Sequence, residues 1–299
     1  MRKDRLLERF LRYVAISSQS STKVKTVPSS DGQWDMARLL AKELTALGLV
    51  DVEISDYAVV TAKLPSNLPE GVKVPTVGWC AHMDRYDAGL SPDIHPQVIK
   101  NYQGGDICLN KEKDIWMRVA EHPEVERYIG DDLVVTDGTS VLGADNKSAI
   151  ANVMTALEIV IQENRPHGTI HVAFVPDEEI GLLGAKKIDF SKFPVDFAYT
   201  IDSCELGELV YQTFNAGGAT LTIRGVTAHP MSAKGVLVNP TLIACDFVNA
   251  LDRKETPECT EDTEGFIWVH SIVSNPRVAT VGIKIRDHNL EGYLSLIHI

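Results

Sequence analysis

The sequence has few cysteines, no long apolar run and no excess of basic residues. Its five cysteines form no Cys-x-x-Cys pair and are odd in number, which favours reduced thiols over a disulfide framework and excludes a zinc ribbon. No stretch reaches the length of a membrane span, and the first ten residues lack the uninterrupted apolar core of a signal peptide. We therefore expect a cytoplasmic protein that has no membrane partner.

Acidic residues outnumber basic ones, which gives a net charge of −12. This charge opposes the phosphate attraction that dominates nucleic-acid binding, so we expect no nucleic-acid partner. The 299 residues are enough for two domains, and 44% hydrophobic with 23% charged residues are typical of a folded globular protein.

Hydrophobic periodicity predicts an α/β arrangement in most of the chain. Helical stripes cover residues 6–14, 36–44 and 150–161, and apolar runs predict strands at 51–64, 75–80, 133–136, 140–142, 169–175 and 197–201. Residues 85–131 are rich in Pro, Gly, Asp and Asn and predict an irregular excursion. Beyond about residue 207, alternating runs at 209–214, 219–224, 266–273 and 278–285, with a helix after Asn239, predict a smaller α+β domain in β-β-α-β-β order.

Residues of the types that ligate metals follow the ends of four predicted strands. The four segments are His82-Met83-Asp84, Asp145-Asn146, Asp177-Glu178-Glu179 and Asp202. In an open α/β sheet the carboxyl ends of the strands meet at one crevice, where so many carboxylates cannot ionise together without cations. One such pair alone is typical of a solvated acidic turn. Four of them indicate a two-metal hydrolase.

The spacing within these segments suggests separate roles. His82 and Asp84 are two residues apart, so they point to the same side of an extended chain, where one can ligate and the other can orient it. The alternative is that His82 is a satisfied core histidine. Glu178 and Glu179 are adjacent and point in different directions, so one can hold metal while the other removes a proton from water. The alternative for Glu178 is a solvent-facing turn residue.

Asp145 follows a Gly-Ala step, and its two oxygens could bridge two cations. His82 and Asp202 would complete the shell of one metal, and Glu179 would serve the other. Mixed nitrogen and carboxylate ligands fit two zinc ions, and ligand type also admits manganese or cobalt.

Five segments resemble a known family of hydrolases. VGWCAHMD, LGADNKS, VAFVPDEEIG, AYTID and HPMSAKGVLVN are similar to the cocatalytic-zinc peptidase and aminoacylase family, and within it to the peptidase T group of tripeptide aminopeptidases. The resemblance implies His82, Asp145 and Asp202 on one zinc, Asp145 and Glu179 on the other, Glu178 as general base and Asp84 in the supporting role. It implies tripeptide substrates and a catalytic domain with a mixed, mainly parallel sheet.

The same resemblance assigns two residues of the smaller domain to the substrate. His229 would polarise the scissile carbonyl or hold the oxyanion, and Arg286 would bind the terminal carboxylate of the tripeptide. Without the resemblance, His229 reads as a loop histidine and Arg286 as a surface charge. Arg85, which follows Asp84, departs from the small or hydroxylated residue that the family usually has there.

The resemblance also sets the expected domains and the competing functions. We expect a catalytic domain at residues 1–207 and an inserted ferredoxin-like lid domain at 208–293. Residues 294–299 can be encoded by a transposon-end adapter, so we interpret them as a scar, with a short natural tail as the alternative. We then expect the family's last zinc ligand, a histidine, to lie beyond this chain, which would leave the chain poorly active. A dipeptidase, carboxypeptidase, N-acyl amino-acid deacylase or non-catalytic homologue are the alternative functions.

Overall fold

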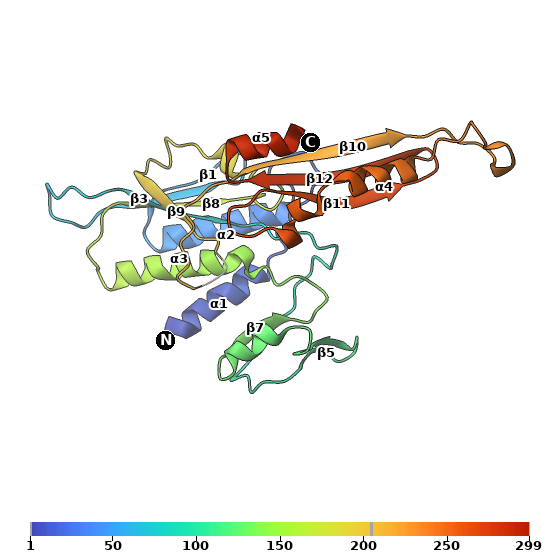
Figure 1. Ribbon diagram of the computed structural model, residues 1–299. Helices are drawn as coiled ribbons and strands as arrows, with labels where there is room; N and C mark the ends of the chain where they lie inside the picture. The colour runs from blue at the N-terminus through green and yellow to red at the C-terminus, as the bar shows by residue number, and fades with distance from the viewer. Residues whose placement is uncertain (1, 204–205, 299) are drawn as a thin grey trace. The chain divides into compact units, whose positions relative to one another are not determined.

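A computed structural model describes residues 2–203 and 206–298 (Figure 1). The chain divides into two compact units, Met1–Cys204 and Glu205–Ile299. The division falls close to the predicted domain boundary after residue 207, and Cys204, one of the five cysteines, lies outside the described residues. The other four are free thiols.

The first unit is built on a five-stranded sheet with the order β1-β2-β8-β3-β9. Its strands are β1 (Val50–Ile54), β2 (Val60–Leu64), β8 (Ile170–Val175), β3 (Val77–His82) and β9 (Phe197–Thr200). β3 runs parallel to both β8 and β9, whereas β2 runs antiparallel to β1 and β8. The predicted mixed sheet is confirmed. In the described part of the chain β9 is an exposed edge strand.

Two amphipathic helices pack against this sheet and a third packs against one of them, as Figure 1 shows in blue and green. They are α1 (Arg2–Val14), α2 (Asp31–Ala46) and α3 (Ala144–Gln162), of which α2 contacts β1 and β2, α3 contacts β3, and α1 contacts α3. The main core contains Tyr13, Met36, Leu40, Leu44, Val60, Ile150, Met154, Leu157, Val172 and Phe174. Burial of each large apolar side chain stabilises the fold by about 1.5–3 kcal/mol. None of the described helices is long and apolar enough to cross a membrane.

The predicted irregular excursion is more regular than expected. It contains β4 (Pro96–Ile99), β5 (Ile107–Asn110), β6 (Ile115–Met117) and the 3-10 helix η1 (Pro123–Tyr128), around a small core of Tyr102, Ile107 and Val125. β7 (Leu133–Thr136) pairs with β4. The predicted strand at 140–142 is wrong, because Asp137 accepts hydrogen bonds from the backbone N–H and hydroxyl of Thr139 and turns the chain into α3.

The second unit is a three-stranded antiparallel sheet with two helices. It consists of β10 (Asn215–Arg224), α4 (Pro240–Ala250), β11 (Phe266–Ser274), β12 (Val278–Asp287) and α5 (Leu290–His298), with the strand order β10-β12-β11. Short 3-10 helices are η2 (Ala185–Lys187) in the first unit and η3 (Pro230–Ser232), η4 (Arg253–Glu255) and η5 (Pro257–Cys259) in the second. Asn239 caps α4 by accepting from the backbone N–H of Thr241, as expected.

Two segments of this unit bear on the sequence predictions, residues 209–214 and residues 294–298. The predicted strand at 209–214 is wrong, because Leu209, Val210 and Tyr211 are exposed and pair with no strand in the described residues, which leaves a β-α-β-β order before α5. The segment interpreted as a scar forms most of α5, and Leu296 within it is buried against the sheet. Its adapter origin stays a prediction, because packing does not report the origin of a segment.

Candidate metal centre

The six residues predicted for the metal site converge within the first unit. His82 is the last residue of β3 and Asp84 lies two residues beyond it, Glu178 and Glu179 follow β8, Asp202 follows β9, and Asp145 lies at the start of α3. β8 and β9 flank β3 and run parallel to it, so all three strands deliver their following residues to the same edge of the sheet. The sheet order therefore explains the convergence.

The imidazole of His82 lies at the centre of the group and is 2% exposed. Its Nε2 atom lies 2.9 Å from Asp145 Oδ1, 3.8 Å from Asp202 Oδ2 and 3.9 Å from Glu178 Oε2. Its Nδ1 atom lies 3.2 Å from Asp84 Oδ1. Because an ionised carboxylate only accepts, Nδ1 donates to Asp84, and Nε2 is turned toward the other carboxylates.

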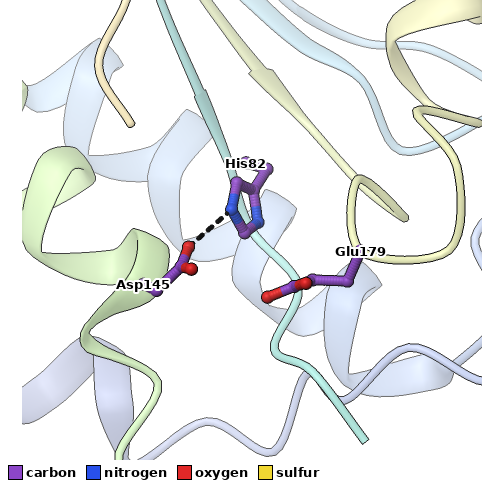
Figure 2. A group of neighbouring side chains, drawn as sticks. All are labelled: His82, Asp145 and Glu179. Atoms are coloured by element: carbon purple, nitrogen blue, oxygen red, sulfur yellow. Dashed lines mark hydrogen bonds and ion pairs between the residues drawn. The ribbon is translucent and has the colours of Figure 1, made fainter. Parts of the chain in front are cut away.

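The side chains form two groups of three with ligand atoms within 4.8 Å of one another. One contains His82, Asp145 and Glu179, which approach from β3, α3 and the turn after β8 (Figure 2). The other contains His82, Glu178 and Asp202. The expected division differs, since it places Asp202 with Asp145 and gives Glu178 a separate role.

The electrostatics of the group favour a bound cation. Burial would lower the pKa of His82, but hydrogen bonds with Asp145 and Asp84 outweigh it and raise that pKa to about 10. Burial and the Asp145 carboxylate raise the pKa of Glu179 to about 7, and burial also raises the pKa of Glu178 and Asp202. Carboxylates that resist ionisation beside one another gain most from a positive charge, so the donor set fits a divalent metal.

Asp84 supports the site through hydrogen bonds to His82 and to the backbone of the turn after β8. It is fully buried, and besides His82 it accepts hydrogen bonds from the backbone N–H groups of Glu178, at 2.9 Å, and Glu179, at 3.1 Å. One carboxylate thus fixes both the imidazole and the turn that carries the glutamates. Its three hydrogen bonds account for its burial without a cation.

Asp145 projects from an irregular start of α3. Gly143 has φ of 75°, a conformation that favours glycine, and Asp145 and Asn146 have non-helical backbone angles. The peptide bond between Asp145 and Asn146 is cis. The side chain of Asp145 is 68% exposed, so it reaches out of the helix toward His82.

Two buried cations beside the site were not anticipated. Arg85 is 1% exposed and donates to the carbonyls of Val141 and Pro92 and to Gln19, so it holds the loop before Asp145 in place. Lys147 is fully buried and donates to the carbonyl of Ile16 at 2.6 Å. The sequence offered one signal for the burial of Arg85, because this residue directly follows Asp84, which belongs to the site.

The two predicted substrate residues belong to the second unit. His229 precedes η3, where its Nδ1 atom accepts a hydrogen bond from the backbone N–H of Met231 at 3.3 Å. Arg286 lies on β12, and its guanidinium lies 4.8 Å from the centre of the Phe214 ring. Stacking on an aromatic ring holds a guanidinium flat while leaving its edge free to donate.

Comparison with curated proteins identifies close relatives over nearly the whole chain. A peptidase T-like protein from Rhizobium meliloti is 53% identical over 291 residues, which cover 97% of this chain and 70% of that protein. Peptidase T from Geobacillus kaustophilus is 44% identical over 292 residues, with the same coverage of 97% and 70%. A family profile described as a peptidase dimerisation domain matches residues 211–295, which lie in the second unit.

Solved structures share the fold. A tripeptidase from Staphylococcus aureus matches with a TM-score of 0.71 and 22% identity, covering 99% of this chain and 69% of that one. An aminopeptidase from Bacillus cereus matches with a TM-score of 0.67 and 23% identity, with the same coverage of 99% and 69%. At these identities the comparison establishes the fold.

Proposed function

The chain belongs to the peptidase T family, and from this premise we propose that it is a metal-dependent aminopeptidase that releases the N-terminal residue from tripeptides. Relatives named peptidase T at 42–45% identity support this proposal, as does the shared fold of the tripeptidase from Staphylococcus aureus. The observation that carries it is the contact of His82 Nε2 with carboxylates from three other segments. The expected cytoplasmic location stays a prediction.

We propose two zinc ions as the cofactor, with manganese or cobalt as substitutes. His82, Asp145 and Asp202 would hold one ion, and Asp145 and Glu179 the other. The support is the buried imidazole of His82, whose Nε2 atom lies 2.9 Å from Asp145 Oδ1 and 3.8 Å from Asp202 Oδ2, and the ligand atoms of His82, Asp145 and Glu179, which lie within 4.8 Å of one another. When bound, the metals would polarise the scissile carbonyl and make water more acidic.

Glu178 is the proposed general base. Its carboxylate takes a proton from the water whose oxygen attacks the carbonyl carbon, and it delivers that proton to the amide nitrogen as the C–N bond breaks. Burial raises the pKa of Glu178, which makes the carboxylate a better proton acceptor. Its backbone N–H is held by Asp84, so the side chain starts from a fixed point.

In the second unit we propose that His229 stabilises the oxyanion and Arg286 binds the terminal carboxylate of the tripeptide. A donor aimed at the developing negative charge lowers the barrier, and a guanidinium fork matches a carboxylate with two parallel hydrogen bonds. The ring of Phe214 beside Arg286 supports this role, because it restricts the guanidinium before substrate arrives.

The proposal is tested with Glu178→Gln, because an amide cannot accept the proton of water. We expect the variant to retain zinc but to lose kcat on tripeptides by about 10² to 10⁴, the range for general acid–base groups. Glu112→Gln removes an exposed carboxylate from the same unit and serves as the matched control. Turnover of the Glu178→Gln variant at the wild-type rate would remove Glu178 from the mechanism.

Substrate choice separates the proposal from related activities. An aminopeptidase requires a free α-amino group, so we expect cleavage of free tripeptides and none of their N-acetylated forms. Cleavage of N-acylated amino acids alone would indicate a deacylase, and cleavage of dipeptides alone would indicate a dipeptidase. A protein that binds zinc but cleaves none of these substrates would be a binding homologue.

A further inference from the structure

A second fully buried carboxylate, Asp177, lies directly before the two glutamates of the site. Its Oδ1 atom accepts hydrogen bonds from the Ser29 hydroxyl at 2.6 Å and the Gln33 amide at 2.7 Å. Its Oδ2 atom accepts from the backbone N–H of Ser29 at 2.8 Å. Its own backbone N–H donates to Gln33 Oε1 at 2.9 Å. Four hydrogen bonds therefore join this one residue to the start of α2.

The partner residues are themselves fixed. Gln33 is fully buried in the first turns of α2, a helix whose later residues Met36 and Leu40 are part of the main core. The Ser29 hydroxyl also accepts from the backbone N–H of Ser21 at 2.8 Å. Asp177 is thus tied to a rigid helix, and the start of that helix is also where a negative charge is stabilised.

The turn after β8 is held from two sides as a result. Asp177 has φ of 53°, a left-handed conformation that aspartate tolerates, and its carbonyl accepts from the backbone N–H of Leu183. On the other side, Asp84 accepts from the N–H groups of Glu178 and Glu179. The peptide groups that carry both glutamates therefore have fixed positions before any ligand binds.

The burial of Asp177 has no ion pair to compensate it among the residues that the structure describes. A buried carboxylate with only neutral donors contributes less to folding than a well-packed apolar side chain commonly does. Its three directional acceptor bonds, in contrast, define one orientation for the turn, which an apolar residue would not.

We propose that Asp177, Gln33 and Ser29 are positioning residues that set the geometry of Glu178 and Glu179 for metal binding and proton transfer. This inference rests on the proposed function, since it concerns the same site. It adds three residues that touch neither substrate nor metal and act through the turn that they hold.

The reciprocal pairing of Asp177 with Gln33 allows a polarity-reversal test. Asp177→Asn alone brings two donor groups together, and Gln33→Glu alone brings two carboxylates together. In the double variant the new amide at position 177 donates to the new carboxylate at position 33. The N–H of Ser29 still finds the amide oxygen, and the carboxylate accepts from the N–H of residue 177. The four connections are retained with two of them reversed, because the amide at position 177 also donates to the Ser29 hydroxyl, which donates to Asp177 Oδ1 in the wild type.

The assay is the zinc dissociation constant, measured by competition with a chelator, together with kcat, KM and the thermal unfolding midpoint Tm. Each single variant is expected to lose about 10- to 100-fold in zinc affinity and in kcat, the range for residues that support metal ligands, with KM little changed. The double variant is expected to recover both. Tyr13→Phe removes the hydrogen bond from Tyr13 to Glu43 farther along α2, and it should lower Tm without changing either quantity.

Three results would overturn the inference. They are wild-type zinc affinity and kcat in both single variants, a double variant no better than the singles, and losses that track Tm alone. If Asp177→Asn does not fold, Ser29→Ala is used in its place. It removes the hydroxyl that contacts Asp177 and Ser21 but keeps the backbone N–H contact with Asp177, so we expect a loss at the lower end of the range. If the wild-type protein binds zinc but cleaves no tripeptide, the proposed function fails, while the zinc affinities of the variants still decide the positioning role.

Discussion

Asp84→Asn would test how far the metal site depends on a residue that we do not expect to bind metal. Asp84 Oδ1 contacts both His82 Nδ1 and the backbone N–H of Glu178, and Oδ2 accepts from the N–H of Glu179. An asparagine has one acceptor oxygen and an amide that only donates. If its oxygen takes the place of Oδ1, its NH₂ group faces the N–H of Glu179, and that buried donor loses its partner.

The structure sets the size of the expected effect. A buried donor left without a partner costs about 1–3 kcal/mol. A free-energy change of about 1.4 kcal/mol corresponds to a factor of ten in affinity. If the whole cost raises the free energy of the metal-bound state, metal affinity falls by roughly 5- to 150-fold. The independent range for supporting residues of metal sites is about 10- to 100-fold. We therefore expect a loss in zinc affinity within that range.

The measurement is the zinc dissociation constant at pH 7, by chelator competition, for the wild type and Asp84→Asn. Asp35→Asn is the matched control, because it removes a carboxylate of similar charge from an exposed pair with Arg38. Its zinc affinity should equal that of the wild type. An affinity in Asp84→Asn within twofold of the wild type would show that His82 and the glutamate turn hold their positions without this carboxylate, which would refute the reasoning.

Two further predictions concern stability. Gly184→Ala should destabilise the protein by about 1–3 kcal/mol, the usual cost of overpacking, because the new Cβ would lie 2.1 Å from the carbonyl oxygen of Pro176. Urea unfolding measures this, with Gly218→Ala, whose Cβ meets only an ordinary contact at 3.5 Å, as the control. Burial lowers the pKa of Lys147 from 10.5 to about 7, so between these values the unfolded chain binds more protons and this residue adds stability as pH rises. Lys147→Met should therefore flatten the rise of unfolding free energy with pH, by at most about 1.4 kcal/mol per pH unit. Parallel curves for metal-free wild type and variant would contradict this.

The sequence was most informative where backbone geometry alone decides direction. His82 and Asp84 are two residues apart at a strand end, and their side chains are in contact in the structure. The convergence with Glu179 and Asp202 followed from the rule that neighbouring parallel strands end at one edge. These inferences needed the order of strands and turns, which apolar runs reveal well.

The sequence was less informative where pairing decides structure. Residues 209–214 alternate like a strand but remain exposed, since alternation records which side chains could be buried and carries no information about a partner strand. Residues 85–131 were judged irregular from their Pro, Gly and Asn content, yet short strands formed because β7 supplied a partner for β4. The sequence could not predict how the ligands group around His82 either, because this grouping depends on distances between separate segments.

Three consecutive acidic residues show why residue type does not determine role. Asp177 is fully buried, whereas the Glu178 side chain is 29% exposed, although all three residues of Asp177-Glu178-Glu179 look alike in the sequence. The difference comes from what each one faces. Asp177 turns back to donors on α2, and Glu178 and Glu179 turn toward His82 and Asp145. A carboxylate whose oxygens are all occupied by protein donors holds the backbone, and one whose oxygens face other carboxylates is left for a cation or a proton. Only the structure shows this difference, by which Asp177 fixes the turn while Glu178 and Glu179 point from it into the site.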